Sequence, residues 1–260
     1  MLKRNFLGFA IGLAAGAWGL ARPSAAAALV DPIRVAAASD LQFALAELAG
    51  LYQRETGDVV QLSLGSSGSF AQQIRQGLPV DLFLSADEDY VFQLATAGLT
   101  RDQGVIYALG RIALVVPADS TIALDPDLTG LREAWPRLRH FAIGNPEHAP
   151  YGRAARQALQ RLELWPLVQP KLVVGENIAQ ATQFVTSGAA QAGITAASLA
   201  KAPEVARLTR ALTLPAQLHA PLRQRMVLMR SASLPAGGFY RFLQTPAARA
   251  VLQRHGFDFE

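Results

Sequence analysis

The sequence predicts an α/β fold in which mainly parallel sheets carry helices on both faces. Short apolar runs, of the length of buried strands, alternate with longer segments whose apolar residues recur at helical spacing. This alternation occurs twice, in residues 33–98 and again in residues 139–195. Because strands and helices that alternate along a chain are typical of parallel sheets, each stretch is expected to form one α/β unit.

The first unit begins with a continuous apolar run at residues 33–38, which predicts a strand buried on both faces. Leucines and a tyrosine at helical spacing between residues 41 and 52 then predict a helix that Gly57 ends. The other expected elements are a strand at 59–64, a helix at 69–76, a strand at 80–84, and a helix opened by a capping box of Ser85 and Glu88 and closed by Gly98.

The second unit repeats this order. Its expected elements are strands at 139–143, 171–174 and 192–195 and helices at 151–164 and 178–186. Long apolar strands at 106–116 and 224–229 lie between and after the two units, and we expect them to cross between two lobes. Helices at 237–243 and 247–254 should then return to the first lobe, which would leave a cleft between the lobes for a ligand.

The amino terminus has the three-part layout of a cleaved export signal. Lys3 and Arg4 precede an apolar run at residues 6–20, and small residues follow up to Ala28. The alternative is a membrane anchor, but the apolar run is shorter than the roughly 20 residues that span a bilayer. Residues 1–28 are therefore predicted to be a signal peptide cleaved near Ala27 or Ala28. The general export signal and the twin-arginine signal both remain possible.

Composition excludes several classes of protein. The chain contains no cysteine, which excludes disulfides, thiol catalysis, a lipidated cysteine anchor and thiolate metal sites. Removal of residues 1–28 takes away three basic residues and no acidic one, so 24 basic against 20 acidic residues becomes 21 against 20. A mature chain so close to neutral gives no reason to expect a nucleic acid partner. No exposed apolar face indicates an oligomer, and a monomer is expected.

Two loops at the carboxyl ends of predicted strands combine serines with the start of a helix. Ser39 follows the first strand, and the segment Gly65-Ser66-Ser67-Gly68-Ser69 follows the second. Open α/β sheets bind ligands at this edge, and the unpaired N–H groups of a helix amino terminus attract anions. The alternative is that each serine only caps its own helix.

The same loop misses the motifs of three enzyme and nucleotide-binding classes. Its second glycine comes one residue too early for the nucleophile elbow G-x-S-x-G, and no Gly-Lys pair follows to make a phosphate-binding loop. The dinucleotide fingerprint G-x-G-x-x-G is also missing. An exported hydrolase that uses Ser67 with His148 as its base remains an alternative class.

Four segments resemble the periplasmic molybdate-binding proteins of ABC transporters in order and spacing. They are AAASDLQFALAELA, GSSGSFAQQIRQGLPVDLFLSAD, IGNPEHAPYGRAARQAL and GENIAQATQFVTSGAAQAGI. The resemblance implies a type II periplasmic-binding-protein fold with two lobes joined by a two-stranded hinge. Lobe 1 would comprise residues 32–111 and 223–260, and lobe 2 residues 112–222. It also implies a periplasmic protein that binds molybdate or tungstate for a membrane permease, without enzymatic activity or cofactor.

In this family, serine hydroxyls and backbone amides from both lobes hold the oxyanion. The resemblance assigns the molybdate ligands to Ser39, Ser67, Ala86, Tyr151 and Ile178, the last two through their backbone N–H groups. One branch adds a tyrosine after the Gly-Ile pair at Gly193, but threonine and alanine follow that pair here. The chain is therefore more similar to the branch that uses a polar residue directly after the first serine, which is Asp40.

Asp40 is unexpected in such a site, where asparagine would fit better. A carboxylate about 4 Å from a dianion costs several kcal/mol in a partly desolvated cleft. The side chain is expected to cap the N–H groups of its own helix, to donate a proton to the anion, or to accept the proton of a ligand such as hydrogen phosphate. The last outcome would favour phosphate over molybdate, and sulfate is a further alternative.

Overall fold

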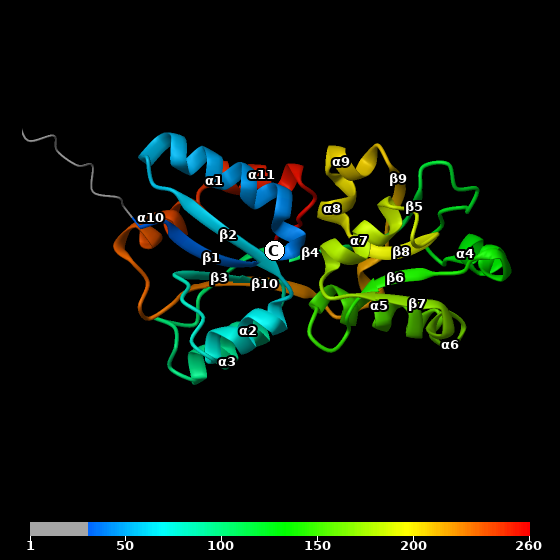
Figure 1. The fold of residues 1–260 in the computed structure, drawn as a ribbon, viewed down its shortest axis with the longest axis horizontal. Helices are drawn as coiled ribbons and strands as arrows, with labels where there is room; N and C mark the ends of the chain where they lie inside the picture. Colours follow the sequence, from blue (N-terminus) through cyan, green and yellow to red (C-terminus); the bar gives the residue numbers. More distant parts are fainter. Residues whose placement is uncertain (1–30) are drawn as a thin grey trace, which may run out of the picture. The chain divides into compact units, whose positions relative to one another are not determined.

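The computed structural model describes residues 31–260, which form one compact unit. The predicted signal peptide, residues 1–28, lies outside the described residues. The unit contains two five-stranded mixed sheets, each with helices packed on both faces (Figure 1). The predicted α/β class is confirmed, and each sheet forms the centre of one lobe.

The first sheet has the strand order β2-β1-β3-β10-β4. Its strands are β1 (Ile33–Ala38), β2 (Val60–Gly65), β3 (Leu82–Ser85), β4 (Val105–Gly110) and β10 (Leu222–Leu228). Strand β1 runs parallel to β2 and β3, whereas β10 is antiparallel to both of its neighbours. One face is covered by α1 (Gln42–Thr56), α10 (Leu234–Phe242) and α11 (Pro246–Arg254), and the other by α2 (Ser67–Arg75) and α3 (Glu88–Thr96).

The second sheet has the order β7-β6-β8-β5-β9. Its strands are β5 (Ile112–Pro117), β6 (Phe141–Gly144), β7 (Leu172–Gly175), β8 (Ala192–Ala196) and β9 (Thr209–Thr213). Strand β6 is parallel to β7 and β8, and β5 is antiparallel to β8 and β9. The helices of this lobe are α4 (Thr129–Ala134), α5 (Pro150–Arg161), α6 (Trp165–Val168), α7 (Ile178–Thr186), α8 (Ala197–Lys201) and α9 (Pro203–Ala206).

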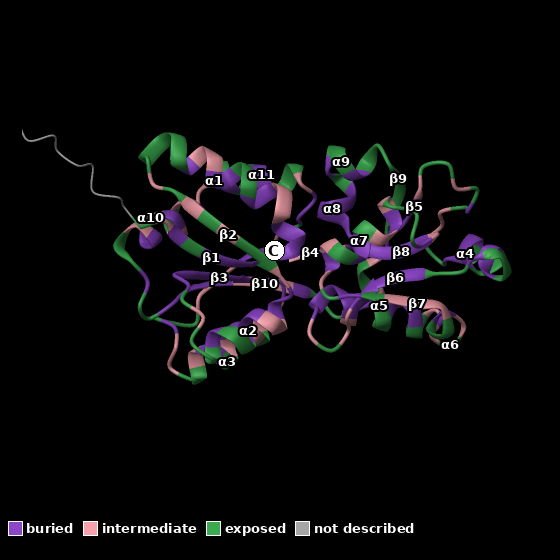
Figure 2. Ribbon diagram, viewed as in Figure 1, coloured by how far each residue is buried: buried purple, intermediate pink, exposed green. Residues whose placement is uncertain are grey.

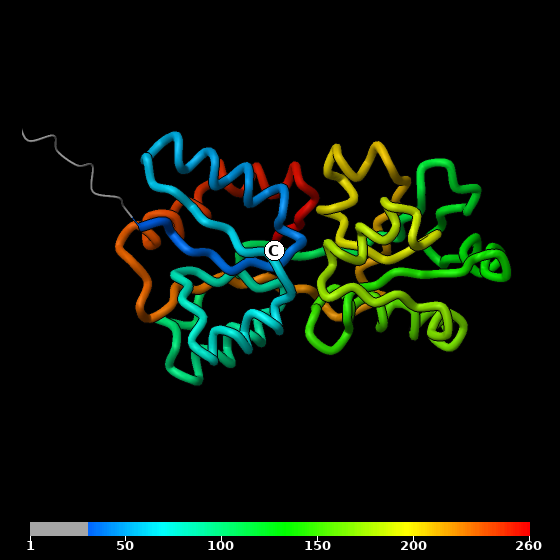
Figure 3. The backbone as a smooth tube through the Cα atoms, in the orientation of Figure 1, coloured from blue at the N-terminus to red at the C-terminus, as the bar shows by residue number. Residues whose placement is uncertain are grey.

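The chain crosses between the sheets twice, close to the same place. It leaves the first sheet at Gly110 and enters the second at Ile112, so the single strand expected at 106–116 is divided at Arg111. It returns through residues 214–221 into β10 (Figure 3). These two crossings make the hinge, and α11 packs on α1 as predicted for the last helices. The proposed lobe boundaries at residues 111, 112, 222 and 223 stay a prediction.

Burial explains most of the elements that the sequence predicted. Buried residues concentrate on the strands and on the sheet-facing sides of the helices (Figure 2). Five of the six residues in β1 are buried, as expected for a continuous apolar run. Gly57 ends α1 in the left-handed conformation, with φ of 81°. Strand β9 was not predicted, because it is an edge strand with exposed positions and has no apolar run.

The capping box predicted at Ser85 is wrong. Helix α3 begins at Glu88, and its cap is Asp87, whose carboxylate accepts a hydrogen bond from the N–H of Asp89 at 2.9 Å. Ser85 is the last residue of β3, and its hydroxyl donates to the carbonyl of Asp87 at 2.7 Å. The strand therefore extends one residue further than expected, and the helix starts later.

Candidate functional site

Three of the predicted ligand residues lie together at the carboxyl edge of the first sheet. The parallel register pairs Ala38 with Gly65 and Ala37 with Leu84, so the turns after β1, β2 and β3 are neighbours. These turns carry Ser39, Ser67 and Ala86, which are all buried. The hydroxyl oxygen of Ser67 accepts a hydrogen bond from the N–H of Ala86 at 2.9 Å.

The other two predicted ligand residues begin two helices of the second lobe. Strands β6 and β7 pair in parallel up to Gly144 and Gly175, and their next turns lead into α5 and α7. Tyr151 lies in the first turn of α5, and Ile178 is the first residue of α7. N–H groups in the first turn of a helix have no acceptor within the helix, so these two are available to a ligand. Both residues are buried.

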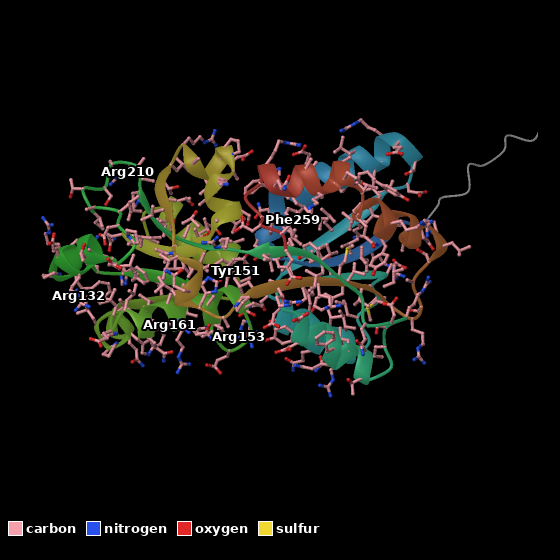
Figure 4. The ribbon with its side chains drawn as sticks, turned by 180° about the vertical axis from the view of Figure 1, so that it is seen from behind. Arg132, Tyr151, Arg153, Arg161, Arg210 and Phe259 are labelled. Atoms are coloured by element: carbon pink, nitrogen blue, oxygen red, sulfur yellow. The ribbon has the colours of Figure 1, made fainter. Side chains whose placement is uncertain are left out.

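The two edges meet between the lobes. The hydroxyl oxygen of Ser39 accepts a hydrogen bond from the N–H of Ala179 in α7 at 3.2 Å. One buried apolar cluster contains Ala38 and Ala86 from the first lobe together with Tyr151 and Ile178 from the second. Tyr151 lies at the junction of the lobes (Figure 4). The structure therefore brings all of the predicted ligand residues to one buried place.

Ala179 is a member of this site that the sequence analysis missed. The resemblance indicated the N–H of Ile178, whereas the contact with Ser39 is made by the next residue along the same helix turn. Successive N–H groups of a first turn all point towards the helix start, so a sequence pattern does not distinguish between them.

Asp40 is buried beside these residues and bonded to both lobes. Its Oδ2 accepts hydrogen bonds from the Tyr151 hydroxyl at 2.9 Å and from Nε2 of Gln224 at 2.6 Å. The expectation that Asp40 caps its own helix is wrong, since neither the short 3-10 helix Ser39–Leu41 nor α1 has a side-chain cap. Among residues 31–260, its Oδ1 is a buried atom without a hydrogen-bond partner. Burial raises the pKa of Asp40 to about 6, although the bonds from Gln224 and Tyr151 lower it.

Contacts at the rim of the site join the lobes directly. The N–H of Gly68 donates to the carbonyl of His148 at 2.9 Å, and the hydroxyl of Ser69 donates to Glu176 at 3.1 Å. Arg153 of the second lobe also forms an ion pair with Asp87 of the first. The structure is thus that of a closed cleft.

The hydrolase alternative fails on the same contacts. His148 is 2.8 Å from the hydroxyl of Ser66 through Nδ1, whereas the Ser67 hydroxyl oxygen is bonded to the N–H of Ala86. The pair of Ser67 as nucleophile and His148 as base, which this alternative requires, is therefore not formed. Ser66 instead caps α2, since it accepts a hydrogen bond from the N–H of Ser69.

The donors of the site are neutral. None of the six predicted residues is Lys, Arg or His. Within residues 31–260 there is also no group of three or more His, Cys, Asp or Glu side chains that could hold a metal ion. The site offers hydroxyl and backbone N–H groups from both lobes, a donor set suited to an anion that needs no counter-cation.

Comparisons with known proteins agree with this geometry. A family model described as bacterial extracellular solute-binding protein matches residues 33–258. The molybdate-binding protein ModA of Rhodobacter capsulatus is 32% identical over 247 residues, which cover 92% of this chain and 91% of that protein. ModA of Escherichia coli K12 is 31% identical over 234 residues, covering 86% and 88%. The solved periplasmic molybdate-binding protein of Azotobacter vinelandii matches with a TM-score of 0.81 and 30% identity, covering 88% of this chain and 99% of that one.

Proposed function

Because the chain belongs to the family of bacterial extracellular solute-binding proteins, we propose that it captures molybdate or tungstate and delivers it to the permease of an ABC transporter. The observation that carries the proposal is the set of buried, neutral donors that two lobes direct at one place. The names of the relatives that cover most of the chain support the choice of molybdate. Tungstate has nearly the same size and charge, so both anions fit the same donors.

The serines retain a hydrogen for the ligand even though both hydroxyl oxygens are already bonded. A hydroxyl has one donor hydrogen and two acceptor lone pairs. Ser39 accepts from the N–H of Ala179, and Ser67 accepts from the N–H of Ala86. Each hydroxyl hydrogen can therefore turn to the anion while the oxygen keeps its present contact.

The hydroxyl and N–H donors of the site favour a fully deprotonated ligand. A fully deprotonated dianion accepts from every donor, whereas a ligand proton facing an N–H leaves that group unpaired, at about 1 to 3 kcal/mol. Hydrogen phosphate is disfavoured on this ground, and sulfate differs from molybdate by size. Binding then requires no chemistry: the anion bridges donors of both lobes and stabilises the closed form through its higher affinity for it.

The second candidate ligand is hydrogen phosphate, and Asp40 favours it. The unpartnered Oδ1 of Asp40 is an acceptor that could take the proton of such a ligand. A phosphate-binding protein would use this acceptor, whereas a molybdate-binding protein has no use for it.

A thermal-shift panel of molybdate, tungstate, sulfate and phosphate tests both candidates. A ligand at 100 times its Kd stabilises the folded state by about 2.7 kcal/mol, so a specific ligand raises Tm by several degrees. We expect molybdate and tungstate to do so in the wild type and in Asp40→Asn. A phosphate shift that is lost in Asp40→Asn would replace the molybdate proposal. No shift with any of the four anions would refute an oxyanion site.

Substitution of Gly68 is expected to hinder closure of the lobes. A Cβ at this position would lie 2.7 Å from the carbonyl oxygen of His148 and 2.7 Å from the Tyr90 hydroxyl. Overpacking of this kind costs about 1 to 3 kcal/mol, and the part of the cost that comes from His148, in the second lobe, falls only on the closed form. Gly68→Ala should therefore raise the Kd for molybdate about fivefold or more in calorimetry.

The matched control is Gly50→Ala in α1, where a Cβ would meet only an arginine nitrogen at 3.5 Å. This variant should bind as the wild type does. Equal affinity in the two variants would show that the approach of Gly68 to the second lobe does not matter for binding.

The proposal includes export of the protein. The chain would lose residues 1–28 by cleavage near Ala27 or Ala28 and act in the periplasm as a monomer. Among residues 31–260, no helix is long and apolar enough to cross a membrane.

A further inference from the structure

A chain of buried hydrogen bonds connects the hinge with the proposed anion site. The Tyr107 hydroxyl donates to Oε1 of Gln224 at 2.6 Å. Nε2 of Gln224 donates to Oδ2 of Asp40 at 2.6 Å and to the Tyr151 hydroxyl at 2.9 Å. The Tyr151 hydroxyl in turn donates to Asp40. Gln224 is thus hydrogen-bonded to Tyr107, Asp40 and Tyr151.

The bonding pattern determines the orientation of the Gln224 amide. Both N–H donors of the amide are used, one by Asp40 and one by the oxygen of Tyr151, and its carbonyl accepts from Tyr107. A rotated amide would place its carbonyl oxygen against the Asp40 carboxylate, which is also an acceptor. Gln224 has no exposed surface, so water cannot replace a lost partner.

The network lies on both strands that lead to the hinge. Tyr107 belongs to β4 and Gln224 to β10, and these strands pair with Gly110 opposite Leu222. The register of the pair shifts directly after Gln224, and such irregularities often redirect a side chain. A Cβ at Gly110 would lie 2.5 Å from the Tyr151 hydroxyl and 2.9 Å from Nε2 of Gln224. The network therefore fills space that only a glycine leaves at the hinge.

At its other end the network reaches the second lobe. Tyr151 is the only one of its four side chains that comes from that lobe, and it sits in the first turn of α5. The backbone N–H of the same residue is one of the proposed anion donors. A contact that holds the Tyr151 side chain against the first lobe also holds that donor in place.

We propose that Gln224 is a positioning residue for oxyanion binding: it ties the hinge strands to Tyr151 and Asp40 and so holds the donor at the start of α5 in the closed arrangement. This inference rests on the proposed function and deepens it. Gln224 acts through Asp40 and Tyr151 rather than through contact with the anion. Of the hydrogen bonds of Gln224, only the one to Tyr151 crosses between the lobes, so the loss of Gln224 should weaken the closed form more than the open one.

The first test is the molybdate affinity of Gln224→Met, a change that keeps the length of the side chain and removes its polar atoms. We expect Kd to rise at least about fivefold. The rise should come from a higher dissociation rate, while the association rate changes little. Gln93→Met, at an exposed position of α3, is the matched control and should keep the wild-type rates. A general loss of stability would not separate the two rates in this way.

A milder variant covers the case in which Gln224→Met does not fold. Tyr107→Phe removes one hydroxyl at the far end of the network and frees the amide to rotate. Tyr107→Phe should also raise the dissociation rate, by a smaller factor than Gln224→Met does. The proposal would be overturned if each of these two variants that folds releases molybdate at the wild-type rate.

A ligand-free measurement separates this inference from the proposed function. Because the chain contains no cysteine, Gln72→Cys in α2 and Gln160→Cys in α5 can carry a pair of spin labels on the two lobes. We expect Gln224→Met or Tyr107→Phe to shift the distance distribution towards longer separations, and Gln93→Met to leave it unchanged. An unshifted distance distribution would overturn the positioning role of Gln224 even if molybdate binds. A shifted distribution in a protein that binds no oxyanion would refute only the proposed ligand.

Discussion

Ser67→Ala should weaken molybdate binding at least tenfold. The hydroxyl of Ser67 is fully buried, and its hydrogen is available to the anion while its oxygen accepts from the N–H of Ala86. Loss of a hydrogen bond to a charged group costs about 1.5 to 3 kcal/mol, which corresponds to a factor of about 10 to 150 in Kd. The variant also leaves the N–H of Ala86 without its acceptor, so we expect a lower Tm without ligand.

Isothermal titration calorimetry measures this effect, with circular dichroism to establish that the variant is folded. Ser187→Ala, at an exposed position just after α7, provides a matched serine control and should bind with wild-type affinity. An unchanged Kd in Ser67→Ala would remove this residue, and with it the edge of the first sheet, from the proposed site.

The stability of the ligand-free protein should carry a pH-dependent contribution from Asp40 that falls as pH rises from about 4 to 6. Burial raises the pKa of Asp40 from 3.8 to about 6, so the folded state binds this proton more tightly than the unfolded state does. Protonated Asp40 therefore stabilises the fold at low pH, and this contribution is lost as pH rises to the folded-state pKa. At about 1.4 kcal/mol for each pKa unit, the loss amounts to about 3 kcal/mol.

Urea unfolding of the wild type and Asp40→Asn at pH 4 and at pH 7.5 isolates this contribution, because other titrating groups cancel in the difference. From pH 4 to pH 7.5, the free energy of unfolding of the variant should increase by about 3 kcal/mol relative to that of the wild type. A constant offset is also expected, since the new amide has an N–H where Oδ1 of Asp40 has no partner. A difference in stability that does not change with pH would contradict the raised pKa.

Local patterns predicted the regular elements well where burial alone determines them. The apolar run of β1 and the helical spacing of α7 agree with the structure at both ends, and Gly57 ends α1. The predictions were wrong where a tertiary contact competes with a local one. Ser85 belongs to β3, where it pairs with Arg225 of β10, and Asp87 caps α3 in its place.

The candidate site was predicted more by resemblance than by spacing. Sequence position indicated that Ser39 and Ser67 follow neighbouring strands, and the parallel register explains why they meet. The residues of the second lobe came only from the resemblance. Gln224 and Tyr107 gave no signal, because a polar residue within an apolar strand looks the same whether it faces solvent or a buried network.

By itself the sequence determined the α/β class, the two units and the loops that place serines at helix starts, because strand and helix periodicities and turn residues are local properties. Only the tertiary structure decided what Asp40 does. Its partners Tyr151 and Gln224 lie 111 and 184 residues away. Gln224 meets Asp40 within the first lobe, whereas Tyr151 reaches it only when the two crossings bring the lobes together. The burial that raises its pKa is likewise a property of the closed arrangement and of no shorter segment.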